Sequence, residues 1–345
     1  CYKKLNMSKK NSNVILKKNF KGYKNLAKVY LNFKKKIDDF KKKTFLVAVS
    51  GGPDSLALVA LTKAYQFEKK SEFFYVLINH NIRKNSSKEA KQVQILLKKY
   101  NIRLNILINK KKITKNIQGQ ARSIRYQMLL NFCKNKNIKT ILTAHNLEDQ
   151  VETFFIRLSR GSGLTGLSSM QPLSKLNKSV NLSRPLLDIK KEILKKISKV
   201  VFGKFFKDPS NVDDKYLRTK IRKLKTPLEN SGINYDQIFR SIKNLAVSRI
   251  TLEKYVSQIT KKLVIKSKGQ VSVNFSKFCK LDDEIKSKII YESIKHVSKN
   301  YYNPRFKKVH NLIKTLKFQK NMKNTLGGCI ILKNKGKLIF RKEKM

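Results

Sequence analysis

The stretch LVAVSGGPDSLAL, residues 46–58, joins an apolar run to a pair of glycines and then to a helix-like pattern. Residues 45–49 are apolar and rich in strand-forming types, whereas apolar residues recur at helical spacing after Pro53. Gly51 and Gly52 allow a tight turn in which successive N–H groups face an anion, and the following helix directs its positive end to the same place. The stretch therefore predicts a phosphate-binding loop, the alternative being a serine-capped helix start without a ligand.

Strand-like and helix-like segments alternate along the first part of the chain. The strand-like runs are residues 44–49, 73–79, 104–108 and 140–143, and the helix-like stretches lie near residues 54–67, 87–100, 118–135 and 147–158. This alternation predicts an α/β fold with a doubly wound parallel sheet. Ser50, His80 and His145 each follow a strand-like run, so we expect them to meet at the carboxyl edge of the sheet, where ligands bind.

The alternation stops near residue 208, and helical periodicity follows until two short strands around the turn Asn334-Lys335-Gly336. We expect Met7 to be the start of translation. We divide the chain into a basic N-terminal extension at 1–24, the α/β domain at 25–215, a basic linker helix at 216–235, and a smaller, mostly helical domain at 236–345 that ends in a short β-hairpin.

The charge of the chain points to a polyanionic partner. Its 345 residues include 79 Lys and Arg against 22 Asp and Glu, a formal charge of +57, and nucleic acid is the first candidate, although an AT-rich genome accounts for part of the lysine bias. No apolar run is long enough to span a membrane. The four cysteines are widely spaced without a CxxC pair, which argues against zinc, iron–sulfur or disulfide frameworks and favours a reducing cytoplasm.

A second stretch, TAHNLEDQVETFFIRLSRGSGLTGLSSM at residues 143–170, carries a helix-like pattern with two acids apart from its apolar face. The predicted apolar face consists of Leu147, Val151, Phe154, Phe155 and Leu158. Asp149 and Glu152 lie three residues apart on another face, and carboxylates near a phosphate loop are natural ligands of the Mg²⁺ that accompanies ATP. The alternative is a pair of exposed acids that balance lysines.

Six segments occur in the order and approximate spacing of the tRNA(Ile)-lysidine synthases, which are PP-loop ATP pyrophosphatases. They are SGGPDS, NHNIRKNSSKEA, QARSIRYQML, AHNLEDQVETFFIRLSRGSGLTGL, SRPLLDIKKEIL and DPSNVDDKYLRTKIR, between residues 45 and 222. The terminal TLGGC…KLIFRKE resembles the end of the first C-terminal domain of that family. The resemblance implies a PP-loop domain of the adenine nucleotide alpha hydrolase type at 25–215 and a tRNA-binding domain at 236–345.

The resemblance also implies the reaction. ATP, with Mg²⁺, adenylates the C2 oxygen of the wobble cytidine in tRNA(Ile) with a CAU anticodon, and free L-lysine then displaces AMP. The product, lysidine, changes codon reading from AUG to AUA. The expected location is the cytoplasm, with no membrane partner, and whether the enzyme forms a homodimer is left open.

The resemblance assigns roles to individual residues. The implied ATP-binding residues are Ser50, Gly51, Gly52, Pro53, Asp54 and Ser55. The implied catalytic residues are Asp54, Arg122, His145 and Asp149, with Asp54 and Asp149 as metal ligands. The implied contacts to tRNA or substrate are Arg125, Glu152, Arg160, Gly161, Ser162, Gly163, Lys215, Arg218 and Arg222. Arg122 and Arg125 lie three apart, so one helical face can present both guanidinium groups to the α-phosphate or the anticodon.

Three residues depart from the family pattern. Asn79 and Glu148 stand where aspartates are common, and Asn146 stands where a second histidine is usual. One rival function is that of a tRNA thiolase, which needs a persulfide or cluster-bearing cysteine. A small-molecule amide ligase would leave the charge unexplained, and a non-catalytic RNA-binding protein would need neither the loop nor the paired acids.

Overall fold

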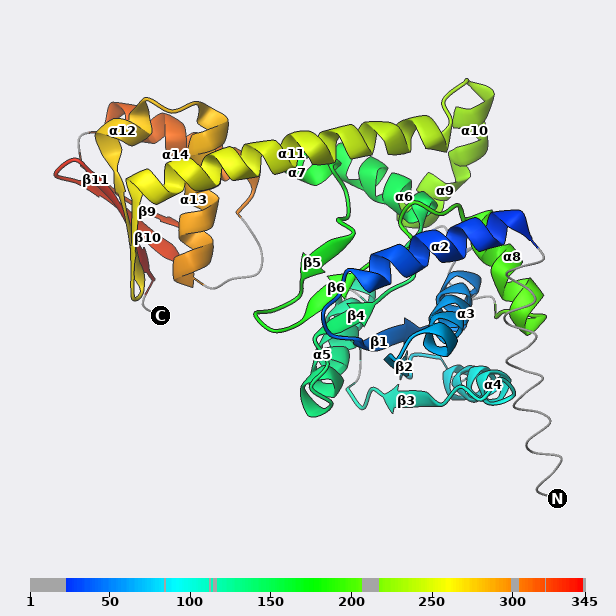
Figure 1. Cartoon of the computed structure of the whole chain (residues 1–345). Coiled ribbons are helices and arrows are strands. Elements are labelled where there is room, and N and C mark those ends of the chain that lie inside the picture. The colour runs from blue at the N-terminus through cyan, green and yellow to red at the C-terminus, as the bar shows by residue number, and fades with distance from the viewer. Residues whose placement is uncertain are drawn as a thin grey trace, which may run out of the picture. The chain divides into compact units, whose positions relative to one another are not determined.

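The computed structural model describes residues 23–83, 85–111, 113, 117–206, 217–298, 304–319 and 321–343 (Figure 1). The chain divides into two compact units, Cys1–Ala246 and Val247–Met345. The boundary between them falls inside the long helix α11 (Tyr235–Leu263). The division into extension, α/β domain, linker helix and C-terminal domain stays a prediction.

The first unit contains a six-stranded sheet in the order β3-β2-β1-β4-β6-β5. All neighbouring strands run parallel except β5, which pairs antiparallel with β6. The strands are β1 (Thr44–Val49), β2 (Glu72–Asn79), β3 (Leu104–Ile108), β4 (Thr140–Leu142), β5 (Leu173–Lys175) and β6 (Asn181–Ser183). The predicted α/β class with a mostly parallel sheet is confirmed. The order places β1 and β4 side by side at the centre, so the loops after them lie next to each other.

Helices cover both faces of this sheet, as the alternation of side chains along β1 requires. Phe45 and Val47 join a core with apolar residues of α2, α3, α4 and α8, whereas Leu46 joins the core on the α5 side. The helices of this unit are α2 (Lys24–Asp38), α3 (Pro53–Glu68), α4 (Ser86–Lys98), α5 (Ile117–Asn135), α6 (Leu147–Leu158), α7 (Leu164–Leu167), α8 (Lys191–Phe202), α9 (Leu217–Lys223) and α10 (Lys225–Asn230). None of the helices that the structure describes combines the length and apolar character needed to cross a lipid bilayer.

The second unit contains an antiparallel sheet in the order β7-β8-β11-β10-β9. Its strands are β7 (Val264–Ser267), β8 (Gln270–Asn274), β9 (Met322–Leu326), β10 (Cys329–Asn334) and β11 (Lys337–Lys342), and its helices are α12 (Phe275–Cys279), α13 (Asp283–Ser298) and α14 (Phe306–Phe318). The predicted terminal hairpin is the β10–β11 pair. Inward residues such as Val271, Ile331 and Phe340 pack with α13 and α14 in one continuous core.

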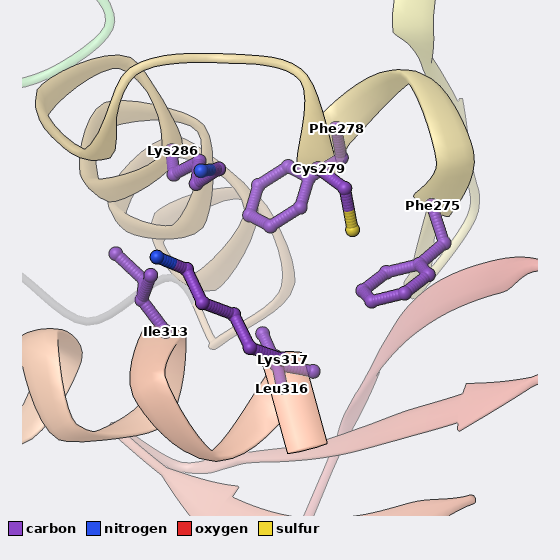
Figure 2. Close-up of a pocket in the computed structure, with 7 residues that line it drawn as sticks. All are labelled: Phe275, Phe278, Cys279, Lys286, Ile313, Leu316 and Lys317. Carbon is purple, nitrogen blue, oxygen red and sulfur yellow. The ribbon is translucent and has the colours of Figure 1, made fainter. Parts of the chain in front are cut away.

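A small pocket lies in this second unit between α12, α13 and α14 (Figure 2). It is lined by Phe275, Phe278, Cys279, Lys286, Ile313, Leu316 and Lys317. Its wall is mostly apolar, and both of its lysines lie near the Asp283 carboxylate, at 3.1 Å for Lys286 and 4.0 Å for Lys317. The pocket is therefore a small gap in the packing of these helices, and we assign no ligand to it.

Candidate functional site

The glycine loop joins β1 to α3 in a conformation that requires glycine at its centre. Gly51 has φ +82°, and a Cβ atom there would lie 2.5 Å from Cγ2 of Val93. The Gly51 carbonyl accepts a hydrogen bond from the backbone of Phe206 at 3.0 Å, so the chain after α8 holds the loop. Gly52 has no side chain to cap α3, which leaves N–H groups of the first turn to face an anion.

Two serines at either end of the loop stabilise its shape. The buried Ser55 hydroxyl accepts from the Ser50 backbone N–H at 3.2 Å and donates to the Gly52 carbonyl at 3.0 Å. The Ser50 hydroxyl lies 3.1 Å from the same oxygen, and Ser50 itself is exposed. Ser55 therefore acts on the loop from inside, while Ser50 remains accessible to a ligand. These contacts fit the predicted phosphate loop.

Asp54, in the first turn of α3, carries a half-buried carboxylate that hydrogen bonds satisfy only in part. Its Oδ1 atom is buried and accepts no hydrogen bond within the described part of the chain. Burial raises the pKa of Asp54 to about 6, an effect that Lys191 opposes and Asp149 strengthens. A divalent cation would satisfy this oxygen and offset the repulsion between the two carboxylates.

The donor set at this edge fits Mg²⁺ shared with phosphate oxygens rather than an all-protein metal centre. The described residues contain no group of three or more His, Cys, Asp or Glu side chains arranged to hold a metal ion. Mg²⁺ commonly takes one or two carboxylates and completes its shell with water and substrate phosphates. Asp54, with its unpaired oxygen, and Asp149 are the residues that fit this role.

The loop after β4 begins α6 with a capping box. The Asn146 side chain accepts from the Asp149 backbone at 2.9 Å, and the Asp149 carboxylate accepts from the Asn146 backbone at 3.1 Å. His145 Nδ1 lies 2.9 Å from the Thr143 hydroxyl. Burial lowers the pKa of His145, against the opposing effect of Asp149, so its imidazole is neutral near pH 7. His145 and Asp149 are therefore both fixed beside the glycine loop.

The three departures from the family pattern each have a structural role here. Asn146 is the N-cap just described, a position at which Asn is among the preferred residues. The Glu148 carboxylate accepts from the Lys191 backbone at 2.9 Å and so caps α8. The buried Asn79 amide donates to the Ser87 hydroxyl at 2.9 Å and accepts from the Asn81 backbone at 2.9 Å. All three side chains hold the backbone around the site.

Glu152 is a buried ion-pair centre, not one of the exposed acids that the sequence left as an alternative. Its side chain is 2% exposed. Arg222 of α9 contacts both carboxylate oxygens, through Nε at 2.5 Å and Nη2 at 3.2 Å. Arg218 Nε lies 3.1 Å from Oε2. The structure thus brings Glu152, Arg218 and Arg222 together and links α6 to α9, whereas Lys215 lies outside the described residues.

The helix α5 presents two exposed arginines toward the same edge. Arg122 lies over the Tyr126 ring at 5.0 Å, and its charge acts on His145. Arg125 acts on His80, whose pKa falls to about 4 mainly through burial. Both ring nitrogens of His80 are buried without a hydrogen-bond partner in the described chain. The predicted arginine pair is therefore within electrostatic range of both histidines at the strand ends.

The RGSG segment forms an exposed connection between α6 and α7. Arg160, Gly161 and Gly163 are exposed, Gly161 has φ +64°, and the Ser162 N–H donates to the Arg157 carbonyl at 3.1 Å. The Arg157 guanidinium donates to the carbonyls of residues 166 and 169 at 2.7 and 3.0 Å. The RGSG segment is thus exposed to solvent, and hydrogen bonds to Arg157 hold it and the residues after it in place.

Sequence reasoning missed two arginines with positioning roles. Arg157 anchors the RGSG segment, and the buried Arg184 donates to the Gln171 carbonyl at 2.7 Å and to the Ser174 hydroxyl at 3.0 Å. The charge of Arg184 also acts on His145. Both could have been found by the signal that singled out Arg122, because arginine in a lysine-dominated chain marks a place where fixed, branched hydrogen bonding is needed.

The sheet order and the glycine loop define a PP-loop protein, and the model of the PP-loop domain family matches residues 25–228. The structure of a U34-tRNA thiolase, NcsA from Methanococcus maripaludis with its [4Fe-4S] cluster, is similar in fold, with a TM-score of 0.54 and 19% identity over 64% of this chain and 79% of that chain. That likeness concerns the fold alone. The PP-loop family binds ATP.

The chain belongs to the tRNA(Ile)-lysidine synthase family, as the sequence motifs predicted. The tRNA(Ile)-lysidine synthase of Wolbachia pipientis wMel is 35% identical over 83% of this chain and 68% of its own length. That of Rickettsia akari (strain Hartford) is 30% identical over 90% of this chain and 72% of its own length.

Proposed function

We propose that this protein is a tRNA(Ile)-lysidine synthase that joins free L-lysine to the wobble cytidine of tRNA(Ile) with a CAU anticodon, at the expense of ATP. The observation that carries the proposal is the meeting of a phosphate loop with Asp54, His145 and Asp149 at the carboxyl ends of β1 and β4. Family membership supplies the reaction class. We place the activity in the cytoplasm, where tRNA, ATP and free lysine occur together.

In the first step the cytosine C2 oxygen attacks the α-phosphorus of ATP. The bond from that phosphorus to the bridging oxygen breaks, and pyrophosphate leaves. The backbone N–H groups of Gly51, Gly52, Asp54 and Ser55 bind the phosphates, and Arg122 provides fixed positive charge for the oxygens that gain charge. Asp54 and Asp149 would hold Mg²⁺, which would screen the charge of the polyphosphate.

In the second step the amine of free lysine attacks C2 of the adenylated cytosine. The bond between C2 and its oxygen breaks, AMP leaves with that oxygen, and the amine releases a proton to a base or to solvent. His145 is neutral and held by Thr143, so it is able to accept a hydrogen bond or a proton from the incoming amine. The step converts cytidine to lysidine.

The remaining residues position tRNA. We assign Arg125, Arg160, Gly161, Ser162 and Gly163 to contact with the anticodon region, because they are exposed or half-buried and so are accessible to tRNA. Arg218 and Arg222 act through Glu152, which fixes α9 against α6 and aligns it for tRNA. The surplus of lysines supplies contacts to phosphates, which give affinity without reading the base sequence.

The test is an in vitro modification assay with purified protein, Mg²⁺-ATP, labelled lysine and unmodified tRNA(Ile) carrying the CAU anticodon. Elongator tRNA(Met) is the matched control, because it has the same anticodon sequence. We expect labelled lysine only in tRNA(Ile), with one AMP and one pyrophosphate released for each lysine. Tight tRNA binding by the folded protein without any incorporation would contradict the proposal and favour the non-catalytic RNA-binding alternative.

A further inference from the structure

The helix α8 begins next to the reacting carboxylates. Its first residue, Lys191, donates its backbone N–H to the Glu148 carboxylate at 2.9 Å. Glu148 lies in the first turn of α6, directly before Asp149. The backbone at Lys191 is therefore fixed beside the α6 turn that holds Asp149.

The rest of α8 and the segment after it are fixed to the glycine loop. The Ser198 hydroxyl donates to the Pro53 carbonyl, and the Phe206 N–H donates to the Gly51 carbonyl at 3.0 Å. Because α8 is attached to α6 at its start and to the loop further along, its orientation toward the phosphate site is set. Asp54 lies in the first turn of α3, next to Pro53 and close in sequence to Gly51, the two residues that these hydrogen bonds reach.

The Lys191 side chain is half-buried and has no hydrogen-bond or ion-pair partner among the described residues. Among the charges that act on Asp54, that of Lys191 has the strongest effect, ahead of Asp149 and Glu148. A cation in the first turn of a helix also faces the positive end of the helix dipole, which is unfavourable until an anion arrives.

We propose that Lys191 supplies the ammonium group that binds the triphosphate of ATP at this loop. The loop SGGPDS contains no lysine, unlike phosphate loops of the GxxxxGK[ST] type. The helix α8 supplies a lysine instead, 137 residues after Asp54 in the sequence. The inference rests on the ATP-dependent function proposed above and names a further binding residue for it. Lys191 contacts the phosphate oxygens and offsets the charge that they add beside Asp54 and Asp149.

The test compares three variants in direct binding of Mg²⁺-ATP, measured by isothermal titration calorimetry without tRNA or lysine. Lys191→Met removes the charge and keeps the length of the side chain, and Lys191→Arg keeps the charge. Lys190→Met is the matched control, because Lys190 is the adjacent residue but is half-exposed and paired with Asp236 at 2.6 Å. Circular dichroism and thermal unfolding check that each variant folds.

We expect Lys191→Met to weaken ATP binding about tenfold or more, because a charge-assisted contact is lost. Lys191→Arg should stay within about threefold of the unchanged protein, and Lys190→Met within about twofold, as for a surface pair. Equal ATP affinity for Lys191→Met and Lys190→Met would overturn the inference. Because this readout needs no tRNA, a protein that binds ATP through Lys191 but modifies no tRNA would refute the proposed function and leave the inference about Lys191 standing.

Discussion

The two sheets of this protein differ in the buried polar groups beside them. At the carboxyl edge of the parallel sheet, Asp54 Oδ1 and both ring nitrogens of His80 are buried and have no hydrogen-bond partner in the part of the chain that the structure describes. In the second unit, the strands of the antiparallel sheet direct Val271, Ile331 and Phe340 into a continuous apolar core. The pocket beside this core contains Lys286 and Lys317 (Figure 2), and both lysines lie near the Asp283 carboxylate. Unsatisfied buried groups are costly, so they persist where a ligand completes them. The comparison of the two sheets therefore indicates a ligand site at the carboxyl edge of the parallel sheet.

The largest expected effect comes from removing the charge of Asp54. Asp54→Asn should lower kcat/KM for lysine incorporation about a thousandfold, because the ligand of the proposed Mg²⁺ is lost. Asp283→Asn removes an exposed carboxylate in the second unit and should change kcat/KM by less than about twofold. Steady-state assays of both variants check this contrast, and a comparable loss in both would erase the distinction between the two units.

The next effect concerns the buried ion-pair cluster. Glu152→Gln leaves two arginines without their counter-charge and should lower the free energy of unfolding by about 3 kcal/mol. Glu68→Gln breaks the more exposed pair with Lys34 and should cost less than about 1 kcal/mol. Urea titrations of both variants measure the difference. A cost for Glu152→Gln below that of Glu68→Gln would show that the cluster does not fasten α9 to α6.

A smaller effect separates two glycines that share a left-handed backbone. Gly51→Ala combines positive φ with an overlap on Val93 and should lower the free energy of unfolding by about 2 kcal/mol. Gly269→Ala has the same φ strain in the second unit but open space around it, so about 1 kcal/mol is expected. Thermal unfolding of both variants tests the ranking, and equal losses would mean that Val93 moves aside freely.

The smallest perturbation is chemical labelling of thiols. Burial raises the pKa of Cys133 to about 12, and Cys329 is also buried, whereas Cys279 is exposed. Iodoacetamide at pH 8 should therefore label Cys279 rapidly and reach Cys133 and Cys329 only after unfolding. Peptide mass spectrometry of briefly treated protein checks the order. Early labelling of Cys133 would show that the α5 core opens more readily than its packing indicates.

Hydrophobic periodicity and turn residues predicted the helices and strands that are long enough to show a pattern in the sequence. The strand, glycine turn and helix around residues 44–68 follow from periodicity and turn chemistry, and the alternation that continues to residue 158 predicted the parallel sheet. Strands β5 and β6 have three residues each, too short for a periodic signal. Leu158 was predicted on the apolar face of α6 but is 49% exposed, because it is the last residue of that helix.

The parts of the candidate site formed by residues close together in sequence were predictable, and the parts formed by residues distant in sequence were not. The motifs around Asp54, His145 and Asp149 identified the edge of the sheet at which they lie. The pairing of Glu152 with Arg222 joins positions 70 residues apart, and the approach of Lys191 to Asp54 depends on how α8 packs. Such contacts are decided by three-dimensional packing, and a single sequence carries no local trace of them.

The attachment of Phe206 to Gly51 and of Ser198 to Pro53 also has a consequence for biosynthesis. Ribosomes synthesise the chain from its N-terminus, so the glycine loop leaves the exit tunnel well before α8 does. A nascent chain that ends before residue 206 lacks the backbone donor that fastens the loop. The ability to bind nucleotide therefore arises late in translation, after most of the first unit has been made.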